Sequence, residues 1–191
     1  MKNVPNILTT LRLLACPILI YLFFFKVYLG ILIIFILACL TDFFDGYIAR
    51  KESLKSNFGK ILDPIADKAL IISMCVLLII NDDISGLHKM AFYIIILREI
   101  IVTSLRFNLV DKNKSIDVSL LSKYKTFIQM IAIGSLISFM IYNDPYVFVG
   151  YKVNYLTIFL ISFVKFFAWL SAFITVITGV QHYKTYLKLK K

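Results

Sequence analysis

Long apolar runs separated by short polar stretches dominate the chain. Six runs stand out, at residues 6–25, 30–48, 61–80, 89–110, 120–142 and 155–180. They are continuous and do not alternate, so they predict helices and not the strands of a closed barrel, the other structure that spans a bilayer. A membrane-spanning helix needs about 20 apolar residues. The pattern therefore predicts an all-α, polytopic membrane protein with six transmembrane helices.

The composition supports a membrane protein and argues against a soluble one. Hydrophobic residues make up 60% of the 191 residues, against roughly 45–50% in soluble domains. The formal net charge is +10, and almost all of the excess lies between or beyond the apolar runs. Such a distribution indicates contact with anionic lipid and a topology signal, and not nucleic-acid binding. We expect a single membrane domain over residues 1–191.

Lysine and arginine define the expected orientation. One set of basic residues lies before the first run, after the second and fourth runs, and in the tail: Lys2, Arg50, Lys51, Lys55, Lys60, Arg106, Lys112, Lys114, Lys123, Lys125, Lys184, Lys188, Lys190 and Lys191. The opposite loops contain Lys26, Lys89 and Lys152. Because basic residues favour the cytoplasmic side, both termini are predicted to be cytoplasmic in a multi-pass protein of the cell membrane.

Four aspartates lie where lipid disfavours them. Asp42 and Asp45 are near the predicted cytoplasmic end of the second helix, and Asp63 and Asp67 near that of the third. A charged side chain at the centre of a membrane helix costs a few kcal/mol even on lenient scales. Spacings of three and four residues place each pair on one helix face. Two antiparallel helices joined by the loop 51–58 would bring both pairs together, and we expect the active site there.

Converging carboxylates repel one another and bind protons unless a divalent ion neutralises them. Oxygen ligands favour magnesium, calcium or manganese over zinc, and two such ions act together in displacements at phosphorus. The small residues Gly46, Ala49 and Gly59 would leave room for a bulky diphosphate. The alternative is helix capping, and Asp63 followed by Pro64 is typical of a helix start. Capping does not explain two matching pairs flanked by small residues.

These positions match a known signature. The pattern Asp42-x2-Asp45-Gly46-x2-Ala49-Arg50-x8-Gly59-x3-Asp63-x3-Asp67 resembles that of the CDP-alcohol phosphotransferase family at every fixed position. The resemblance implies six helices, a cytosolic active site, two Mg²⁺ or Mn²⁺ ions and a homodimer. It also implies that all four aspartates bind metal and that Asp67 is the general base. Gly46, Ala49, Arg50 and Gly59 would then line the CDP site.

Outside the signature, the chain is similar to the bacterial phosphatidylglycerophosphate synthases within that family. The similar stretches include Pro5-Asn6-x-Leu8-Thr9-x2-Arg12, Arg98-Glu99-Ile100, Ser104-Leu105-Arg106 and Lys123-x-Lys125-Thr126-x2-Gln129-Met130. Ser122 departs from the glycine usual in that group. The similarity implies transfer of a phosphatidyl group from CDP-diacylglycerol to glycerol 3-phosphate in anionic phospholipid biosynthesis, giving phosphatidylglycerophosphate and CMP.

Three cations on the fourth and fifth predicted helices are candidates for binding the acceptor's phosphate: Arg98, Arg106 and Lys125. Arg98 could instead pair with a carboxylate such as Glu99 or one on another helix. Arg106 and Lys125 could extend toward the membrane interface. His88 and His182 fall in an external loop and the tail, and do not indicate a catalytic pair.

Other functions fit parts of the pattern. A sister transferase with a different acceptor, of the cardiolipin or phosphatidylserine type, would share the signature. A cation-coupled transporter would also carry intramembrane acids, but its helices are usually repeated and broken near the midplane. The acids here gather at one predicted face of the membrane, which favours an enzyme acting on cytosolic substrates. A catalytically inactive scaffold would leave the four aspartates without a purpose.

Overall fold

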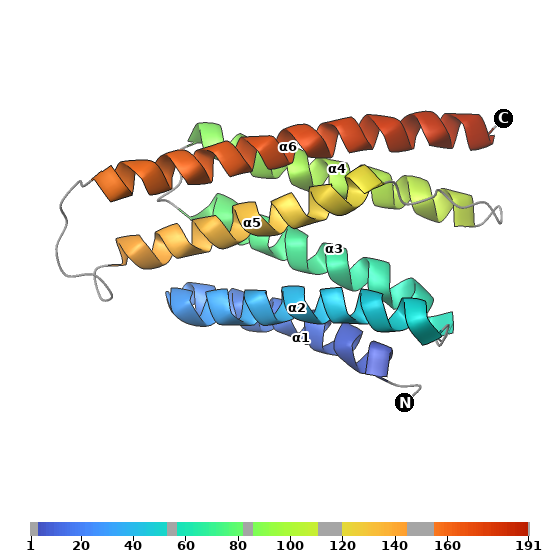
Figure 1. The fold of residues 1–191 in the computed structure, drawn as a ribbon, viewed down its shortest axis with the longest axis horizontal. Coiled ribbons are helices and arrows are strands. Elements are labelled where there is room, and N and C mark those ends of the chain that lie inside the picture. Colours follow the sequence, from blue (N-terminus) through green and yellow to red (C-terminus); the bar gives the residue numbers. More distant parts are fainter. Residues whose placement is uncertain (1–3, 53–56, 82–85, 111–119, 145–154, 191) are drawn as a thin grey trace. The chain divides into compact units, whose positions relative to one another are not determined.

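The computed structural model describes residues 4–52, 57–81, 86–110, 120–144 and 155–190 of the chain. All regular secondary structure in these ranges is helical, which confirms the all-α prediction (Figure 1). The helices are α1 (Val4–Phe24), α2 (Tyr28–Glu52), α3 (Asn57–Ile80), α4 (Gly86–Val110), α5 (Leu120–Asn143) and α6 (Tyr155–Lys190).

Each predicted apolar run corresponds to one of these helices, and the largest difference lies at the end of α6. Hydrophobicity predicts that this helix ends at residue 180, yet it continues to Lys190. The extension contains several lysines and leucines, which favour helix, and no proline or glycine follows Gly179. At 36 residues α6 is about 54 Å long, well beyond the roughly 30 Å of a bilayer's hydrocarbon core.

A tight turn joins α1 to α2. The N–H of Lys26 donates to the carbonyl of Phe23, and the N–H of Val27 donates to the carbonyl of Leu22, both at 3.0 Å. This pair of bonds is the Schellman motif, in which one residue adopts the left-handed conformation that glycine usually supplies. Here that residue is Lys26, with a φ of 56°. The turn reverses the chain, and α1 packs along α2 (Figure 1).

The contacts divide the chain into two units, Met1–Leu77 with Leu136–Tyr151 and Leu78–Ser135 with Lys152–Lys191. In the first unit, one stripe of α1 is buried at intervals of three and four residues: Thr9, Arg12, Ala15 and Leu19. On α2 the buried positions Ile31, Phe35 and Ala38 follow the same spacing. The helical period of 3.6 residues accounts for both stripes, so each helix buries one face.

The second unit contains α4, α6 and the part of α5 up to Ser135, and its side-chain contacts fix the helix directions. His88 meets Trp169, and ten residues later Arg98 meets Thr178, so α4 and α6 run in the same direction. Ser122 meets His182 and Gln129 meets Thr175, so α5 runs opposite to α6. Three successive helices that each cross the same membrane would alternate in direction in this way.

Within the described residues, two helical stretches are long and apolar enough to cross a membrane by length and composition. They are Tyr124–Asn143 in α5 and Ile158–Leu189 in α6. The described apolar parts of α1, α2 and α3, namely Thr9–Phe24, Tyr28–Thr41 and Lys68–Ile80, are shorter. The apolar helices support a membrane protein, and the count of six spans stays a prediction.

The left-handed conformation at Lys26 generates a stability prediction. A side chain in this conformation costs about 1–2 kcal/mol, which glycine avoids at some entropic cost. Lys26→Gly should therefore raise the stability by about 1 kcal/mol, seen as a higher Tm of the purified protein in detergent. The control, Lys89→Gly inside α4, should lower stability by about the same amount because glycine weakens an ordinary helical position. A lower Tm for Lys26→Gly would contradict the analysis of this turn.

Candidate active site

The backbone places the four aspartates on two helices of the first unit. Asp42 and Asp45 lie in the C-terminal half of α2, and Asp63 and Asp67 in the N-terminal half of α3. Because α3 begins at Asn57, Asp63 is in its second turn, and the alternative that Asp63 starts the helix is wrong. The side chains of all four lie outside the described part of the structure. So do those of the other predicted signature residues and of one predicted cation: Gly46, Ala49, Arg50, Gly59 and Arg106.

The donor set of the predicted metal site fits hard divalent cations, because four carboxylates offer oxygen ligands and no sulfur or imidazole. Elsewhere, among residues with described side chains, no group of three or more histidine, cysteine, aspartate or glutamate side chains is placed to hold a metal ion. The four aspartates therefore remain the predicted ligands.

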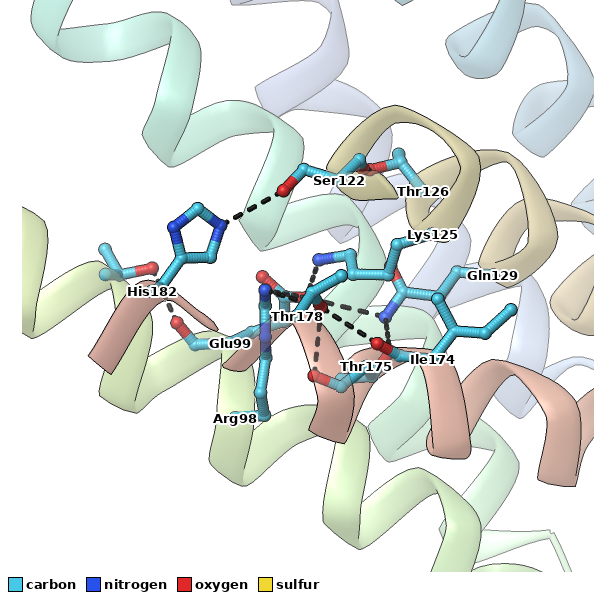
Figure 2. Close-up of polar contacts among 11 residues, drawn as sticks. Arg98, Glu99, Ser122, Lys125, Thr126, Gln129, Ile174, Thr175, Thr178 and His182 are labelled. Carbon is cyan, nitrogen blue, oxygen red and sulfur yellow. Dashed lines mark hydrogen bonds and ion pairs between the residues drawn. The ribbon is translucent and has the colours of Figure 1, made fainter. Parts of the chain in front are cut away.

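A buried polar cluster joins the three helices of the second unit, and it contains two of the predicted acceptor-binding cations. We call it the Glu99 cluster, and its members are Arg98, Glu99, Lys125, Gln129, Thr175 and Thr178 (Figure 2). One carboxylate oxygen of Glu99, Oε1, accepts hydrogen bonds from Arg98 Nη1 at 3.1 Å, from Lys125 Nζ and from Gln129 Nε2 at 3.4 Å. Glu99 is only 2% exposed. The carboxylate thus draws two cations from different helices to one point.

Hydroxyl groups of α6 hold the other ends of this network. Arg98 Nη2 donates to Thr178 Oγ1 at 2.9 Å, and Gln129 Nε2 donates to Thr175 Oγ1 at 3.1 Å. Thr178 Oγ1 also lies within hydrogen-bond distance of the Ile174 and Thr175 carbonyls, at 2.9 and 3.0 Å. Residues three apart on a helix share a face, so the two threonines form one polar patch on the side of α6 that contacts Arg98 and Gln129. The guanidinium of Arg98 is therefore fixed at two of its nitrogens.

Both cations of the cluster are buried and paired. Arg98 and Lys125 are 8% and 6% exposed, and each is paired with Glu99. Burying a charge is costly unless it is paired and hydrogen-bonded, which these contacts provide. Arginine and lysine are also residue types that bind phosphate through charge-assisted hydrogen bonds, which are among the stronger ones in proteins.

Gly179 makes room for Arg98. A Cβ atom added at Gly179 would lie 3.1 Å from Cγ of Arg98 and 3.5 Å from its Nε. The first distance is tighter than ordinary van der Waals contact. The arginine stem therefore lies directly against the backbone of α6, one residue after its partner Thr178. A larger residue at position 179 would push the guanidinium away from Thr178 and Glu99.

The structure brings together two of the three predicted cations and adds residues that the sequence did not point to. Arg98 pairs with Glu99, as the alternative for Arg98 anticipated, and Lys125 shares the same carboxylate. Thr175 and Thr178 were not predicted, because isolated small polar residues in an apolar run carry little signal, and Gln129 was named only as part of a similar stretch, without a role.

His182, predicted to lie in the tail and not to belong to a catalytic pair, is 4% exposed. Its Nε2 lies 3.1 Å from Oγ of Ser122. The contact joins the extension of α6 to the start of α5. Ser122 therefore contributes a side-chain contact at the position where the similar sequences usually have glycine.

Comparison with known proteins identifies the family. A family profile described as CDP-alcohol phosphatidyltransferase matches residues 2–177, nearly the whole chain. The chain belongs to the CDP-alcohol phosphatidyltransferase family. The resemblance to this family that was inferred from the sequence is confirmed.

Several relatives of this CDP-alcohol phosphatidyltransferase carry one name, CDP-diacylglycerol–glycerol-3-phosphate 3-phosphatidyltransferase. The protein of Rickettsia typhi is 38% identical over 192 residues, covering 96% of this chain and 97% of the relative. That of Rickettsia prowazekii is 38% identical over 191 residues, with 96% and 94% covered. The Bacillus subtilis protein is 31% identical over 198 residues, with the same two coverages.

The close approach of Arg98 to α6 predicts the effect of filling position 179. Gly179→Val should destabilise the protein by about 1–3 kcal/mol, the usual cost of overpacking, although valine favours helix more than glycine does. The control is Gly86→Val, because an added Cβ there meets nothing within 4 Å. Thermal unfolding in detergent should show a lower Tm for Gly179→Val and a change of less than 1 kcal/mol for Gly86→Val. Equal effects of the two substitutions would refute the close contact.

Proposed function

We propose that this chain transfers the phosphatidyl group of CDP-diacylglycerol to glycerol 3-phosphate, giving phosphatidylglycerophosphate and CMP in anionic phospholipid biosynthesis. The observation that carries the proposal is a buried cluster in which Glu99 brings together Arg98 and Lys125, two residues of the types that bind phosphate. The relatives that match this chain over more than nine tenths of its length bear a name that states this reaction. Family membership supports the same class of transfer.

The aspartates would act on the reacting groups. A hydroxyl oxygen of glycerol 3-phosphate attacks the phosphorus that bears the diacylglycerol, and the bond from that phosphorus to the CMP oxygen breaks. Asp67 accepts the hydroxyl proton as general base, and CMP leaves with the bond's electron pair. Two Mg²⁺ or Mn²⁺ ions, held by Asp42, Asp45, Asp63 and Asp67, would stabilise the negative charge on the phosphates.

The donor's nucleotide would bind along the signature residues that follow the first two aspartates. Gly46, Ala49 and Gly59 have little or no side chain, so a diphosphate could approach the helix backbone. Arg50 would supply positive charge for the phosphates of CDP. In this proposal these four residues recognise the part of the donor that departs as CMP.

The acceptor's phosphate would bind the cations of the Glu99 cluster. Glycerol 3-phosphate differs from glycerol by a phosphate of up to two negative charges, which Arg98 and Lys125 would bind through charge-assisted hydrogen bonds. Arg106 lies eight residues after Arg98 on α4, about two helical turns further along, and would be a third cation for that phosphate. Serine and phosphatidylglycerol, acceptors of sister enzymes, present different charges and sizes.

We further propose that residues 1–191 form a single membrane domain with six spans, as a multi-pass homodimer of the cell membrane. Both termini and the active site would face the cytoplasm. The support is the match between the six apolar runs of the sequence and six helices, the alternating directions of α4, α5 and α6, and the lysine-rich extension of α6. Lipid would cover the many large apolar side chains that are exposed, such as Phe166 and Phe173.

An acceptor panel tests the proposed function. Purified protein with CDP-diacylglycerol and Mg²⁺ should release CMP with glycerol 3-phosphate far faster than with glycerol, serine or phosphatidylglycerol, and excess EDTA should stop the release. Lys125→Met should raise the KM for glycerol 3-phosphate roughly tenfold to a hundredfold, the range expected for lost hydrogen bonds to charged groups. Another acceptor that outcompetes glycerol 3-phosphate would overturn the proposed specificity, and turnover in excess EDTA would overturn the metal requirement.

Removing the proposed general base should nearly abolish turnover. Asp67→Asn is expected to lower kcat by about 100-fold to 10,000-fold, the usual contribution of a positioned base. The folded protein should still be recovered from the membrane with its Tm little changed. Asp144→Asn makes the same chemical change just beyond the end of α5, outside the signature, and should keep the wild-type rate. An Asp67→Asn protein with most of its activity would exclude Asp67 as the base.

A further inference from the structure

Glu99 lies in the cluster without being an obvious reactant. It has one carboxylate oxygen that receives three donors, and it is 2% exposed. Under the proposed reaction a negative group is not needed to bind an acceptor phosphate, and by itself it would repel that phosphate. The purpose of a carboxylate between two phosphate-binding cations therefore requires a separate explanation.

The geometry indicates what the carboxylate does. Arg98 and Glu99 are adjacent on α4, where successive side chains diverge by about 100° around the axis. Arg98 nevertheless turns back to place Nη1 3.1 Å from Glu99 Oε1, and Lys125 reaches the same oxygen from α5. Figure 2 shows the two cationic groups drawn toward this carboxylate. Without the negative charge, two buried cations at this separation would repel each other.

We propose that Glu99 is a positioning residue for the acceptor, and that its carboxylate holds Arg98 and Lys125 side by side as a pair of donors for one phosphate. This inference rests on the proposed function, because it assumes that the two cations bind the acceptor. Glu99 touches neither substrate in this account. It sets the spacing and direction of the groups that do.

The contacts with α6 strengthen the inference. Arg98 is fixed by Glu99 at one nitrogen and by Thr178 at another, so its guanidinium plane is determined. Gln129 Nε2 joins Glu99 Oε1 to Thr175 Oγ1, so the carboxylate is also tied to α6. A phosphate binds best to donors that are already in place, since ordering flexible side chains on binding reduces affinity. The cluster provides that order before any acceptor arrives.

The test is Glu99→Gln, which keeps the shape of the side chain and removes its charge. The KM for glycerol 3-phosphate should rise roughly tenfold to a hundredfold, because misplaced Arg98 and Lys125 would make weaker hydrogen bonds to the charged phosphate. The KM for CDP-diacylglycerol and kcat should change less than about threefold. A purely structural role would instead lower kcat or raise both KM values in parallel. Asp144→Asn is the control for removing a carboxylate charge elsewhere.

A double-mutant cycle shows whether Glu99 acts through Lys125. Effects on residues in contact are coupled, whereas independent effects add. If Glu99 works by positioning Lys125, then Glu99→Gln combined with Lys125→Met should raise the KM for glycerol 3-phosphate by clearly less than the product of the two single effects. Effects that multiply fully would overturn the proposal.

A second variant keeps the proposal testable if Glu99→Gln fails to fold. Glu99→Asp retains the charge and withdraws it by one methylene from Lys125, and it should raise the KM for glycerol 3-phosphate several-fold with the donor's KM unchanged. No change in the acceptor's KM for either Glu99 variant would overturn the positioning role. Failure of the proposed function looks different: Lys125→Met would itself leave that KM unchanged, or wild type would prefer another acceptor.

Discussion

The Glu99 carboxylate lies in an apolar helical unit and meets two cations and an amide, and the packing of α4, α5 and α6 is arranged around these pairings. A buried charge is tolerated only when partners with good geometry surround it. Each helix therefore has to present a matching group at the same level: Arg98 and Glu99 from α4, Lys125 and Gln129 from α5, and the two threonines from α6. A shift of any helix by one turn, about 5.4 Å, would separate these groups.

Such a cluster is better understood as a means of fixing register than as a source of stability. Replacing a buried ion pair with apolar residues is often neutral or stabilising, whereas removing one partner is strongly destabilising. Apolar contacts such as those of Ile95 and Ala172 are compatible with several helix offsets, but the bonds of the cluster are not. The same groups that set the register include two cations of the types that bind phosphate. In our account the fold and the recognition of the acceptor's phosphate thus share one set of residues.

The sequence predicted the six helices well because long continuous apolar runs indicate helices. It failed at helix ends and turns, where the local sequence pattern differs from the observed structure. The extension of α6 beyond residue 180 is polar, so hydrophobicity did not mark it, although its residues favour helix. Lys26 occupies a conformation usually taken by glycine, which no pattern of apolar residues reveals. Asp63 and Pro64 are typical of a helix start, yet α3 begins earlier, at Asn57.

Sequence analysis predicted some residues of the candidate site and missed others. The spacing of Asp42, Asp45, Asp63 and Asp67 and the family signature point to the reacting groups, and Arg98 and Lys125 were noticeable as charges in apolar runs. Arg98 and Lys125 contact the same oxygen of Glu99 because of their side-chain conformations and the packing of three helices. The spacing of residues along one helix cannot reveal such a contact. Thr175 and Thr178 became meaningful once their hydroxyls were found opposite Gln129 and Arg98.

The most direct test of the central claim is an experimental structure of the protein in a lipid nanodisc with glycerol 3-phosphate and Mg²⁺. Our account predicts that the acceptor's phosphate lies within hydrogen-bond distance of Lys125 Nζ and the Arg98 guanidinium, with Glu99 still bridging the two cations. A phosphate bound elsewhere, with Arg98 and Lys125 paired only to Glu99, would contradict it.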